Sequence, residues 1–134
     1  MFTFHVISVF PEPIRAYTES SILGRGQKAK KFKVVLHNLW DNVKKGERVD
    51  GRPYGGGPGM VLRAEPIMKV LNKIKKTPKT KIFIFSPRGK QFDAKIARDW
   101  SKKYEQIILI AGRYEGLDAR IKKMFKAEEI SIGP

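Results

Sequence analysis

The sequence predicts an α/β domain with a mostly parallel sheet and helices on its flanks. Short runs rich in β-branched and aromatic residues recur along the chain, and such runs are typical of buried strands. The segments between them carry apolar residues at helical spacing. Strands that alternate with helices are the pattern of this fold class. The 134 residues are enough for one domain with a real core.

The strands are predicted from their composition and from the residues that end them. The first run stops at Pro11, and the fourth is apolar throughout, which indicates cover on both faces. The predicted strands are Phe2–Phe10, Lys33–Trp40, Lys81–Phe85, Gln106–Ala111 and Ala127–Ile132.

The helices are predicted from apolar spacing and from capping residues. Helical spacing covers Pro13–Lys28, with Gly24 and Gly26 as expected breakers, and Glu65–Lys76. Asp93 can cap a following helix, because its carboxylate accepts from the free amides at a helix start. A short helix is expected over Leu117–Phe125, and the polar, Gly-rich segment Asp41–Gly59 is expected to be one long loop.

The net charge points to a polyanionic partner. The chain has 28 Lys and Arg against 13 Asp and Glu, a formal charge of +15. This balance favours nucleic acid as the partner, and the alternative is an ordinary Lys-rich surface. The chain has no Cys, which excludes disulfides and thiolate metal sites and fits a reducing cytoplasm. No run approaches the roughly 18 apolar residues of a membrane span, and the N-terminus has no signal-peptide pattern.

The stretch Arg52–Met60 has the composition of a shaped loop that meets a partner. Four of its nine residues are Gly and two are Pro. Glycine lets another molecule approach the main chain, and proline fixes it. The stretch is no P-loop, because Gly59 is not followed by Lys and Ser or Thr, and no Rossmann fingerprint, because Pro58 interrupts it.

Three Gly-containing segments follow predicted strands: Ser86–Gly89, Gly112–Gly116 and Ile132–Pro134. Ligands in open α/β sheets bind beyond the carboxyl ends of strands. Each segment alone could be a tight turn, but together they favour a ligand site that admits an adenine or a ribose. Glu115 either accepts hydrogen bonds from a guanine edge or pairs with Arg113 at the surface.

The two histidines are interpreted as strand residues. His5 lies inside the first predicted strand and His37 inside the second. No second histidine or carboxylate stands at metal-ligand spacing, so no metal site is predicted.

Five motifs resemble one known family in order and spacing. They are ISVFPE at 7–12, RPYGGGPGM at 52–60, SPRG at 86–89, GRYEGLDAR at 112–120 and EEISIG at 128–133. Over its whole length the chain is similar to the bacterial tRNA (guanine-N1)-methyltransferases of the TrmD type. The resemblance implies that the chain is the N-terminal part of such an enzyme.

The family implies a SPOUT-type methyltransferase fold, an α/β domain with a deep trefoil knot, of which residues 1–134 would be a single C-terminally truncated domain. It implies a cytoplasmic homodimer that methylates N1 of guanosine-37 in tRNA. The implied methyl donor is S-adenosylmethionine, and magnesium is implied to support the reaction. Glu115 matches the family's guanine-edge carboxylate, and Arg52, Tyr54 and Gly59 lie in the loop at the mouth of the active site. The implied donor-binding residues are Phe85, Ser86, Pro87, Gly112, Tyr114, Gly116, Ser131, Ile132 and Gly133.

The chain departs from the family pattern at two positions and in its length. Asp50 is followed by Gly51 where the family usually has a second acidic residue, and Pro134 stands where Asp is common. The family's catalytic Asp and an Arg near the guanine oxygen are expected beyond Pro134. The catalytic residue is therefore unassigned, and the 134 residues alone are expected to be inactive.

Two rival functions remain open at this point. The first is a non-catalytic, basic RNA-binding α/β domain, which the charge of +15 would suit. The second is an α/β enzyme that uses another nucleotide, against which the missing nucleotide fingerprints weigh. Titration with S-adenosylmethionine separates all three readings.

Overall fold

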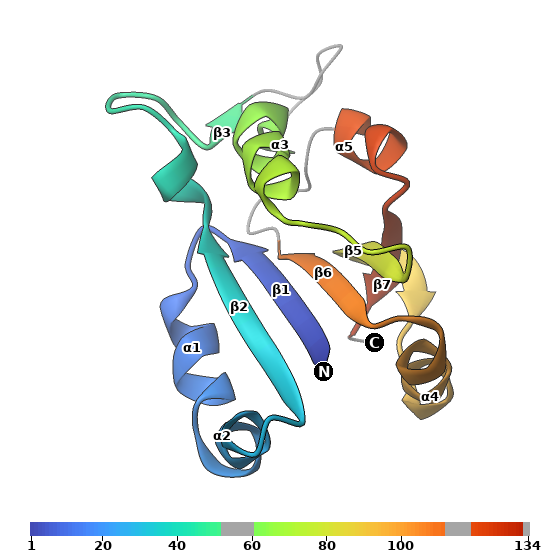
Figure 1. Ribbon diagram of the computed structural model, residues 1–134. Coiled ribbons are helices and arrows are strands. Elements are labelled where there is room, and N and C mark those ends of the chain that lie inside the picture. Colours follow the sequence, from blue (N-terminus) through green and yellow to red (C-terminus); the bar gives the residue numbers. More distant parts are fainter. Residues whose placement is uncertain (52–60, 112–118, 133–134) are drawn as a thin grey trace.

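A computed structural model of the chain describes residues 1–51, 61–111 and 119–132. Its main sheet has the strand order β2-β1-β6-β5-β7, and every pairing between neighbours is parallel (Figure 1). The predicted α/β class with a parallel sheet is thereby confirmed. The strands are β1 (Phe2–Ser8), β2 (Phe32–Asn38), β5 (Thr80–Gln91), β6 (Gln106–Ala111) and β7 (Glu128–Ser131).

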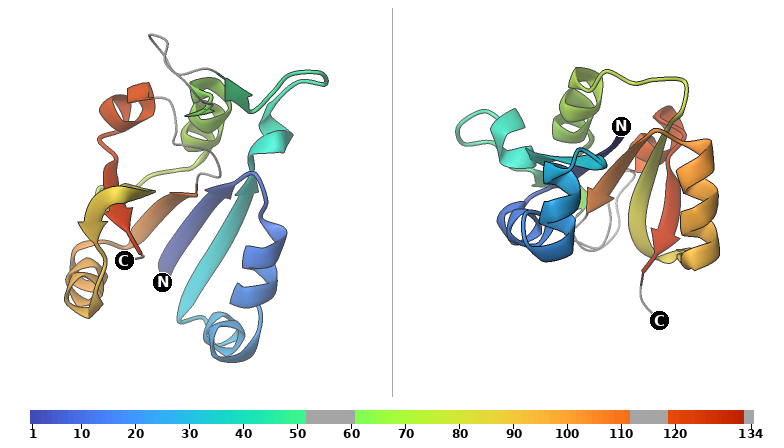
Figure 2. Two further views of the ribbon diagram at one scale, coloured as in Figure 1. Left: turned by 180° about the vertical axis from the view of Figure 1, so that it is seen from behind. Right: turned by 60° about the horizontal axis from the view of Figure 1, so that its bottom comes forward.

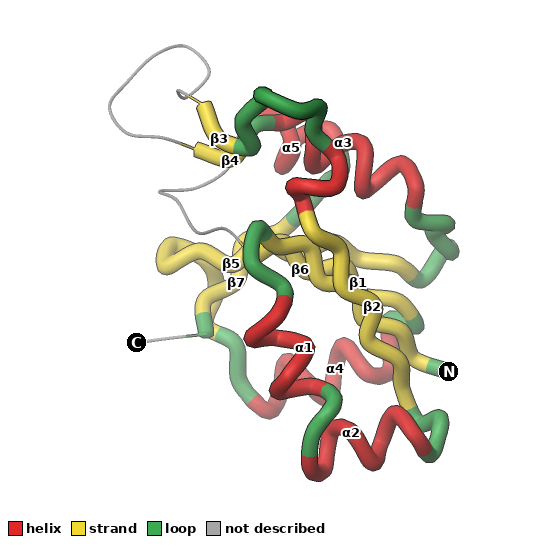
Figure 3. Tube along the Cα trace, turned by 90° about the vertical axis from the view of Figure 1, so that its left-hand side faces the viewer, coloured by secondary structure: helices red, strands yellow, loops and turns green. Residues whose placement is uncertain are grey.

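Helices cover the two faces of the sheet as separate layers. Figures 2 and 3 show α3 and α5 on one face, and α1, α2 and α4 on the other. The helical elements are α1 (Glu12–Thr18), α2 (Ser21–Lys28), the 3-10 turn η1 (Leu39–Asn42), α3 (Ala64–Lys73), α4 (Ala94–Lys103) and α5 (Ala119–Met124). Within the described residues no helix is long and apolar enough to cross a membrane.

The larger core lies between the sheet and the layer of α3 and α5. Ile67 and Leu71 of α3 are completely buried there, together with Ile7 of β1, Ile108 of β6 and Ile121 of α5. Each such side chain contributes roughly 1.5–3 kcal/mol by leaving water. Burial of this apolar face against the sheet stabilises α3 as a helix.

The other face carries a smaller core beside α4. Phe83 is buried there, and its ring stacks on Trp100 of α4 with ring centroids 3.8 Å apart. The predicted cap is confirmed, since the Asp93 carboxylate accepts from the Ile96 amide at 2.8 Å. Leu109 of β6 is only partly buried, so the expected cover of β6 on both faces is incomplete.

The first helical segment breaks at Glu19 and Ser20, so the expectation that glycines break it is wrong. Gly24 and Gly26 both lie inside α2. A Cβ atom on Gly24 would lie 2.3 Å from the carbonyl oxygen of Glu19, so glycine there allows the two helices to approach.

Other boundaries also differ from the sequence prediction, and the second strand, for example, ends at Asn38 rather than at Trp40. The segment predicted as one long loop begins inside η1 and contains strand β3 (Asp50–Gly51), which pairs antiparallel with β4 (Val61–Leu62). Helix α3 ends at Lys73 rather than at Lys76. The predicted loop Ser86–Gly89 lies inside β5.

Candidate functional site

The predicted donor-binding residues that the structure describes lie on two neighbouring strands. Phe85, Ser86 and Pro87 belong to β5, and Ser131 and Ile132 stand at the end of β7. Strand β6 flanks β5 on the other side. The chain segments that leave β6, β5 and β7 therefore start from one edge of the sheet. The predicted residues Arg52, Tyr54, Gly59, Gly112, Tyr114, Glu115, Gly116 and Gly133 lie outside the described residues.

Strand β5 carries a bulge, Ser86–Gly89, that replaces the predicted loop. Phe85 and Lys90 both lie opposite Ile130, so the four residues between them have no counterpart in β7. The strand then continues, because Gln91 pairs with Ser131 and the Phe92 amide donates to the Ser131 carbonyl at 2.8 Å. We call these four residues the β5 bulge.

Two contacts shape the β5 bulge. The Arg88 amide donates to the Ser86 hydroxyl oxygen at 3.2 Å, which tightens the turn. A Cβ atom on Gly89 would lie 2.4 Å from the carbonyl carbon of Glu129 and from the amide nitrogen of Ile130. The backbones of β5 and β7 therefore touch at a position that only glycine can occupy.

Two positively charged side chains near the bulge lie close to the Glu129 carboxylate on β7. Its oxygens lie 3.3 Å from Lys122 Nζ and 3.9 Å from Arg88 Nε. Burial would raise the pKa of Glu129, but a hydrogen bond from Ser86 and the charges of Lys122 and Arg88 hold that pKa below its usual value. Glu129 is therefore ionised at neutral pH.

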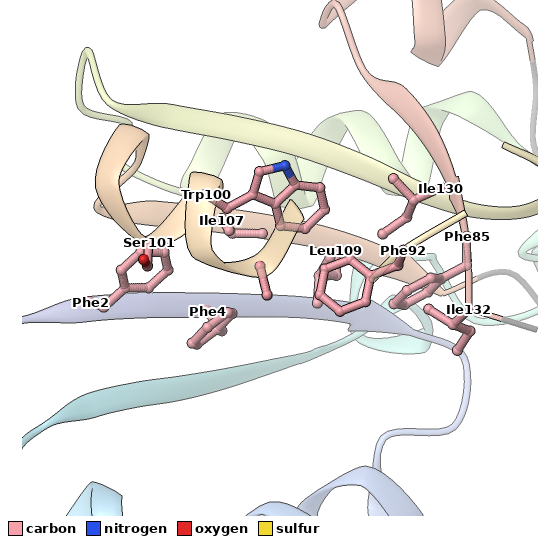
Figure 4. A pocket seen from close by; sticks show the side chains of 11 residues that line it. Phe2, Phe4, Phe85, Phe92, Trp100, Ser101, Ile107, Leu109, Ile130 and Ile132 are labelled. Atoms are coloured by element: carbon pink, nitrogen blue, oxygen red, sulfur yellow. The ribbon is translucent and has the colours of Figure 1, made fainter. Parts of the chain in front are cut away.

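An apolar groove of about 420 Å³ runs between the sheet and α4 (Figure 4). Its volume lies in the roughly 300–1,000 Å³ range of ligand pockets. Phe85 and Ile132 stand at one end, and Phe2 and Phe4 at the other. The lining residues are Phe2, Phe4, Phe85, Phe92, Ala97, Trp100, Ser101, Ile107, Leu109, Ile130 and Ile132.

The end of this groove at Phe85 fits part of an adenosyl group. Its aromatic and aliphatic side chains, Phe85, Phe92 and Ile132, suit the flat face of a purine. The hydroxyl of Ser86 follows directly on Phe85, so polar atoms lie beside the apolar surface. The side chains present are therefore compatible with S-adenosylmethionine at this edge.

The ends of β3 and β4 flank residues 52–60 and are tied by two arginines. Asp50 is buried, and Arg48 binds its carboxylate through two bonds of 2.9 and 3.1 Å. The Arg63 amide donates to the Val49 carbonyl at 2.8 Å, and its guanidinium donates to the Arg48 carbonyl at 2.7 Å. The Asp50 carboxylate thus forms an ion pair with Arg48, which precedes it by two residues in the chain.

The histidines are confirmed as strand residues, and they form a polar chain across the sheet. His5 Nδ1 lies 2.9 Å from His37 Nε2, and Gln106 Nε2 lies 3.0 Å from His5 Nε2. Since the Gln106 amide nitrogen can only donate, the network assigns the His5 proton to Nδ1. Burial above all, followed by the charges of His37, Lys33 and Lys76, lowers the pKa of His5 to about 4. Among the described residues no three His, Asp or Glu side chains form a metal-binding group.

A parallel α/β sheet whose ligand-sized groove reaches the carboxyl end of β7 at Ile132 is typical of the class of proteins that bind a small molecule beyond the strand ends. Within this class the chain belongs to the family described as tRNA (Guanine-1)-methyltransferase TrmD, whose sequence profile matches residues 2–134.

Relatives and a solved structure agree with this family. A tRNA (guanine-N(1)-)-methyltransferase of Caldicellulosiruptor saccharolyticus is 40% identical over 131 residues, which is 97% of this chain and 53% of that protein. One from Dictyoglomus turgidum is 40% identical over 134 residues, 99% of this chain and 54% of that protein. The crystal structure of tRNA (m1G37) methyltransferase from Aquifex aeolicus is 39% identical, with a TM-score of 0.79 over 98% of this chain and 60% of that chain. The chain thus spans about half the length of the curated relatives it matches.

Sequence reasoning missed Glu129 and the groove-lining residues Phe92 and Trp100. Glu128 and Glu129 are adjacent on a strand, so their side chains point to opposite faces. A sequence pattern alone does not tell which of the two lies beside Arg88 and Lys122, because the answer depends on the register between β5 and β7.

Proposed function

We propose that the protein transfers the methyl group of S-adenosylmethionine to N1 of guanosine-37 in tRNA. Residues 1–134 would be a single SPOUT-like donor-binding domain of this enzyme, and the trefoil knot of that fold stays a prediction. The observation that carries the proposal is the match of residues 2–134 to the TrmD family. The strand-end site described above supports it independently.

The donor would bind where the segments after β5, β6 and β7 meet. These three strands are neighbours in the sheet, so the residues that follow them converge at one edge. Phe85, Ser86 and Pro87 of β5 would contact the donor together with Ser131 and Ile132 of β7. Gly112, Tyr114, Gly116 and Gly133 would complete the site. Bound S-adenosylmethionine would supply an electrophilic methyl group on its sulfonium.

Methylation of guanine at N1 requires that the proton on N1 be removed. N1 of guanine carries a proton at neutral pH, so the reaction needs a base for that proton and a positive group near O6. We propose that Glu115 accepts hydrogen bonds from the guanine edge and thereby orients the base. Arg52, Tyr54 and Gly59 would lie at the mouth of the site.

The remaining partners are proposed on charge and on family membership. The net charge of +15 suits the phosphates of tRNA. We further propose that the enzyme acts as a homodimer in the cytoplasm and that magnesium supports the reaction. A basic RNA-binding domain without catalysis is the second candidate, and the same charge favours it.

Calorimetric titration tests the donor site. S-adenosylmethionine should bind the protein, as its gene encodes it, with one site per chain and should be displaced by S-adenosylhomocysteine. Binding of tRNA without any binding of the donor would support the second candidate and refute the methyltransferase proposal.

A further inference from the structure

We propose that Phe10 and Trp40 form an aromatic platform on which an unpaired base of the tRNA stacks, a base that neighbours the target guanosine. The inference rests on the proposed function, since tRNA is the substrate in that proposal. Both side chains are large and apolar, yet Phe10 is 61% exposed and Trp40 is 48% exposed. Exposed apolar side chains mark an interaction site when they gather at one place.

The two aromatic residues follow neighbouring strands at the same edge of the sheet. Ser8 and Asn38 form the last residue pair in the parallel ladder of β1 and β2. Phe10 and Trp40 each stand two residues beyond this pair. Figure 1 shows the ends of β1 and β2 side by side. The two aromatic residues therefore occupy equivalent positions on adjacent strands, at the carboxyl edge of the sheet.

The same local arrangement fixes the backbone at both aromatic residues. In each case the side chain two residues earlier accepts the amide hydrogen at 3.0 Å: the Ser8 hydroxyl accepts from Phe10, and Asn38 Oδ1 accepts from Trp40. Such bonds fix a turn. The residue directly before each ring is buried and anchors the chain. Because the backbone is fixed before a partner binds, less conformational entropy is lost on stacking.

Trp40 also stands on a helical turn that is tied to α3. Leu39, the first residue of η1, is completely buried. At the other end of the turn, Lys73 Nζ of α3 donates to Asn42 Oδ1 at 2.8 Å. Within the described parts of the chain, neither Phe10 nor Trp40 stacks on another aromatic ring. Both rings are therefore available to an external partner.

The surroundings of Trp40 favour an RNA base as that partner. Proteins that recognise single-stranded RNA stack unpaired bases on aromatic rings and place positive charges beside them for the phosphates. Lys44 and Lys45 follow η1 and are both exposed, on a turn in which the Glu47 amide donates to the Lys44 carbonyl at 2.9 Å. The Glu47 carboxylate lies 3.9 Å from Arg63, so the charge of this acid is partly balanced. Aromatic surface and positive charge thus occur in one segment.

The place of the platform agrees with the proposed place of the guanine. Strand β1 lies between β2 and β6 in the sheet. Glu115, which we propose to orient the guanine, follows β6 in the sequence. Neighbouring strands lie about 4.8 Å apart, so the ends of β1 and β2 are roughly 5 and 10 Å from the end of β6. That distance suits a nucleotide next to the guanosine in the RNA loop.

The test measures tRNA affinity by filter binding with the protein as its gene encodes it. Phe10→Ala and Trp40→Ala should each weaken binding of a transcript with guanosine-37 by about tenfold, which lies in the range for one stacked base. Trp40→Phe should stay within about threefold of the unchanged protein, because it keeps an aromatic face. Tyr17→Ala is the matched control, since Tyr17 is 72% exposed but lies on α1 away from the strand ends. Its binding should stay within about twofold, because isolated surface substitutions cost little.

Two readouts distinguish stacking from a loss of charge or of structure. The slope of log affinity against log salt concentration should be the same in Trp40→Ala as in the unchanged protein, because a ring releases no counterions. The double variant of Lys44→Ala with Lys45→Ala should lower this slope. The calorimetric affinity for S-adenosylmethionine should stay within about twofold in Phe10→Ala and Trp40→Ala, since β1 and β2 lie outside the proposed donor site.

Transcripts that lack one base next to guanosine-37 test the same contact from the RNA side. Removal of the base that stacks should weaken binding to the unchanged protein by about tenfold. It should have little further effect in the double variant of Phe10→Ala with Trp40→Ala, because both changes remove one contact. The transcripts also keep the inference testable if an Ala variant is poorly folded, since the unchanged protein alone then gives the answer.

The outcomes separate the two proposals. An unchanged protein that does not bind tRNA refutes the proposed function. Binding that either Ala variant leaves within about twofold removes that ring from the platform. Full binding of the transcripts that lack either neighbour of guanosine-37, or fully multiplicative losses with the double variant, overturns the stacking role. A loss of tRNA binding together with a loss of self-association in sedimentation also overturns it, because the rings would then join two copies of the chain.

Discussion

Replacement of Gly89 by Ala should destabilise the sheet and disturb the donor site together. The new Cβ atom would lie 2.4 Å from two backbone atoms of β7, whereas ordinary contacts begin at 3.4 Å. Backbone atoms cannot rotate away as a flexible side chain would. Strands β5 and β7 would therefore have to separate by about 1 Å, the difference between these two distances.

The expected cost follows from overpacking in a well-packed structure, which is typically about 1–3 kcal/mol. Unfolding entropy of about 2.1 cal/mol/K per residue gives roughly 0.28 kcal/mol/K for a chain of this length. A loss of about 2 kcal/mol then lowers Tm by about 7 °C. Donor affinity should fall as well, because the same residue anchors one end of the β5 bulge.

Thermal unfolding followed by circular dichroism measures this effect. Lys90→Ala is the matched control, since Lys90 is the next residue and is exposed. Its Tm should stay within about 1 °C of the unchanged protein, because surface substitutions usually cost little. If Gly89→Ala also melted within that margin, the close contact between β5 and β7 would be refuted.

Three further predictions concern the donor, tRNA and pH. Gly112→Val and Gly133→Val should each abolish calorimetric binding of S-adenosylmethionine, because a side chain would fill space that the adenosine needs; unchanged affinity in both would remove these residues from the site. The tRNA affinity should fall about 10³-fold or more between roughly 50 and 200 mM salt, and a flat response in a filter-binding series would show the positive charge to be ordinary surface. Burial above all lowers the pKa of His5 from 6.5 to about 4. As the pH falls between these two values, the unfolded chain takes up a proton at His5 while the folded protein does not. The contribution of His5 to the free energy of unfolding should therefore be complete above pH 6.5 and be lost toward pH 4. Urea unfolding across this range should show the loss, and His5→Gln should reduce it; an identical pH dependence in both proteins would contradict the role of His5.

Local patterns were enough to predict the five strands of the main sheet and the capped helix, but not the short strands β3 and β4. The apolar run Gln106–Ala111 became β6 with those bounds, and Asp93 caps α4 as its position before the helix indicated. Both features depend on residues that are near in sequence. The parallel sheet followed from the alternation of strands and helices.

Features that depend on contacts between distant segments were not predictable in this way. The β5 bulge arises from the register against β7, which lies some forty positions further along the chain. Gly24 looked like a helix breaker, but its role is set by its contact with Glu19 at the turn between α1 and α2. The candidate site shows the same division: Ser86 was singled out in a Gly-containing segment after a predicted strand, and Ser131 by the resemblance to the family, whereas the place of Glu129 depends on the register between β5 and β7.

The position of the transferred methyl group tests the central proposal most directly. An unmodified tRNA transcript with guanosine-37 is incubated with S-adenosylmethionine and the protein as its gene encodes it, then digested and sequenced by mass spectrometry. We predict 1-methylguanosine at position 37 and none in a transcript with adenosine at that position. Methylation at another atom or position, or no methylation with a protein that is shown to bind both tRNA and donor, would contradict the proposed function.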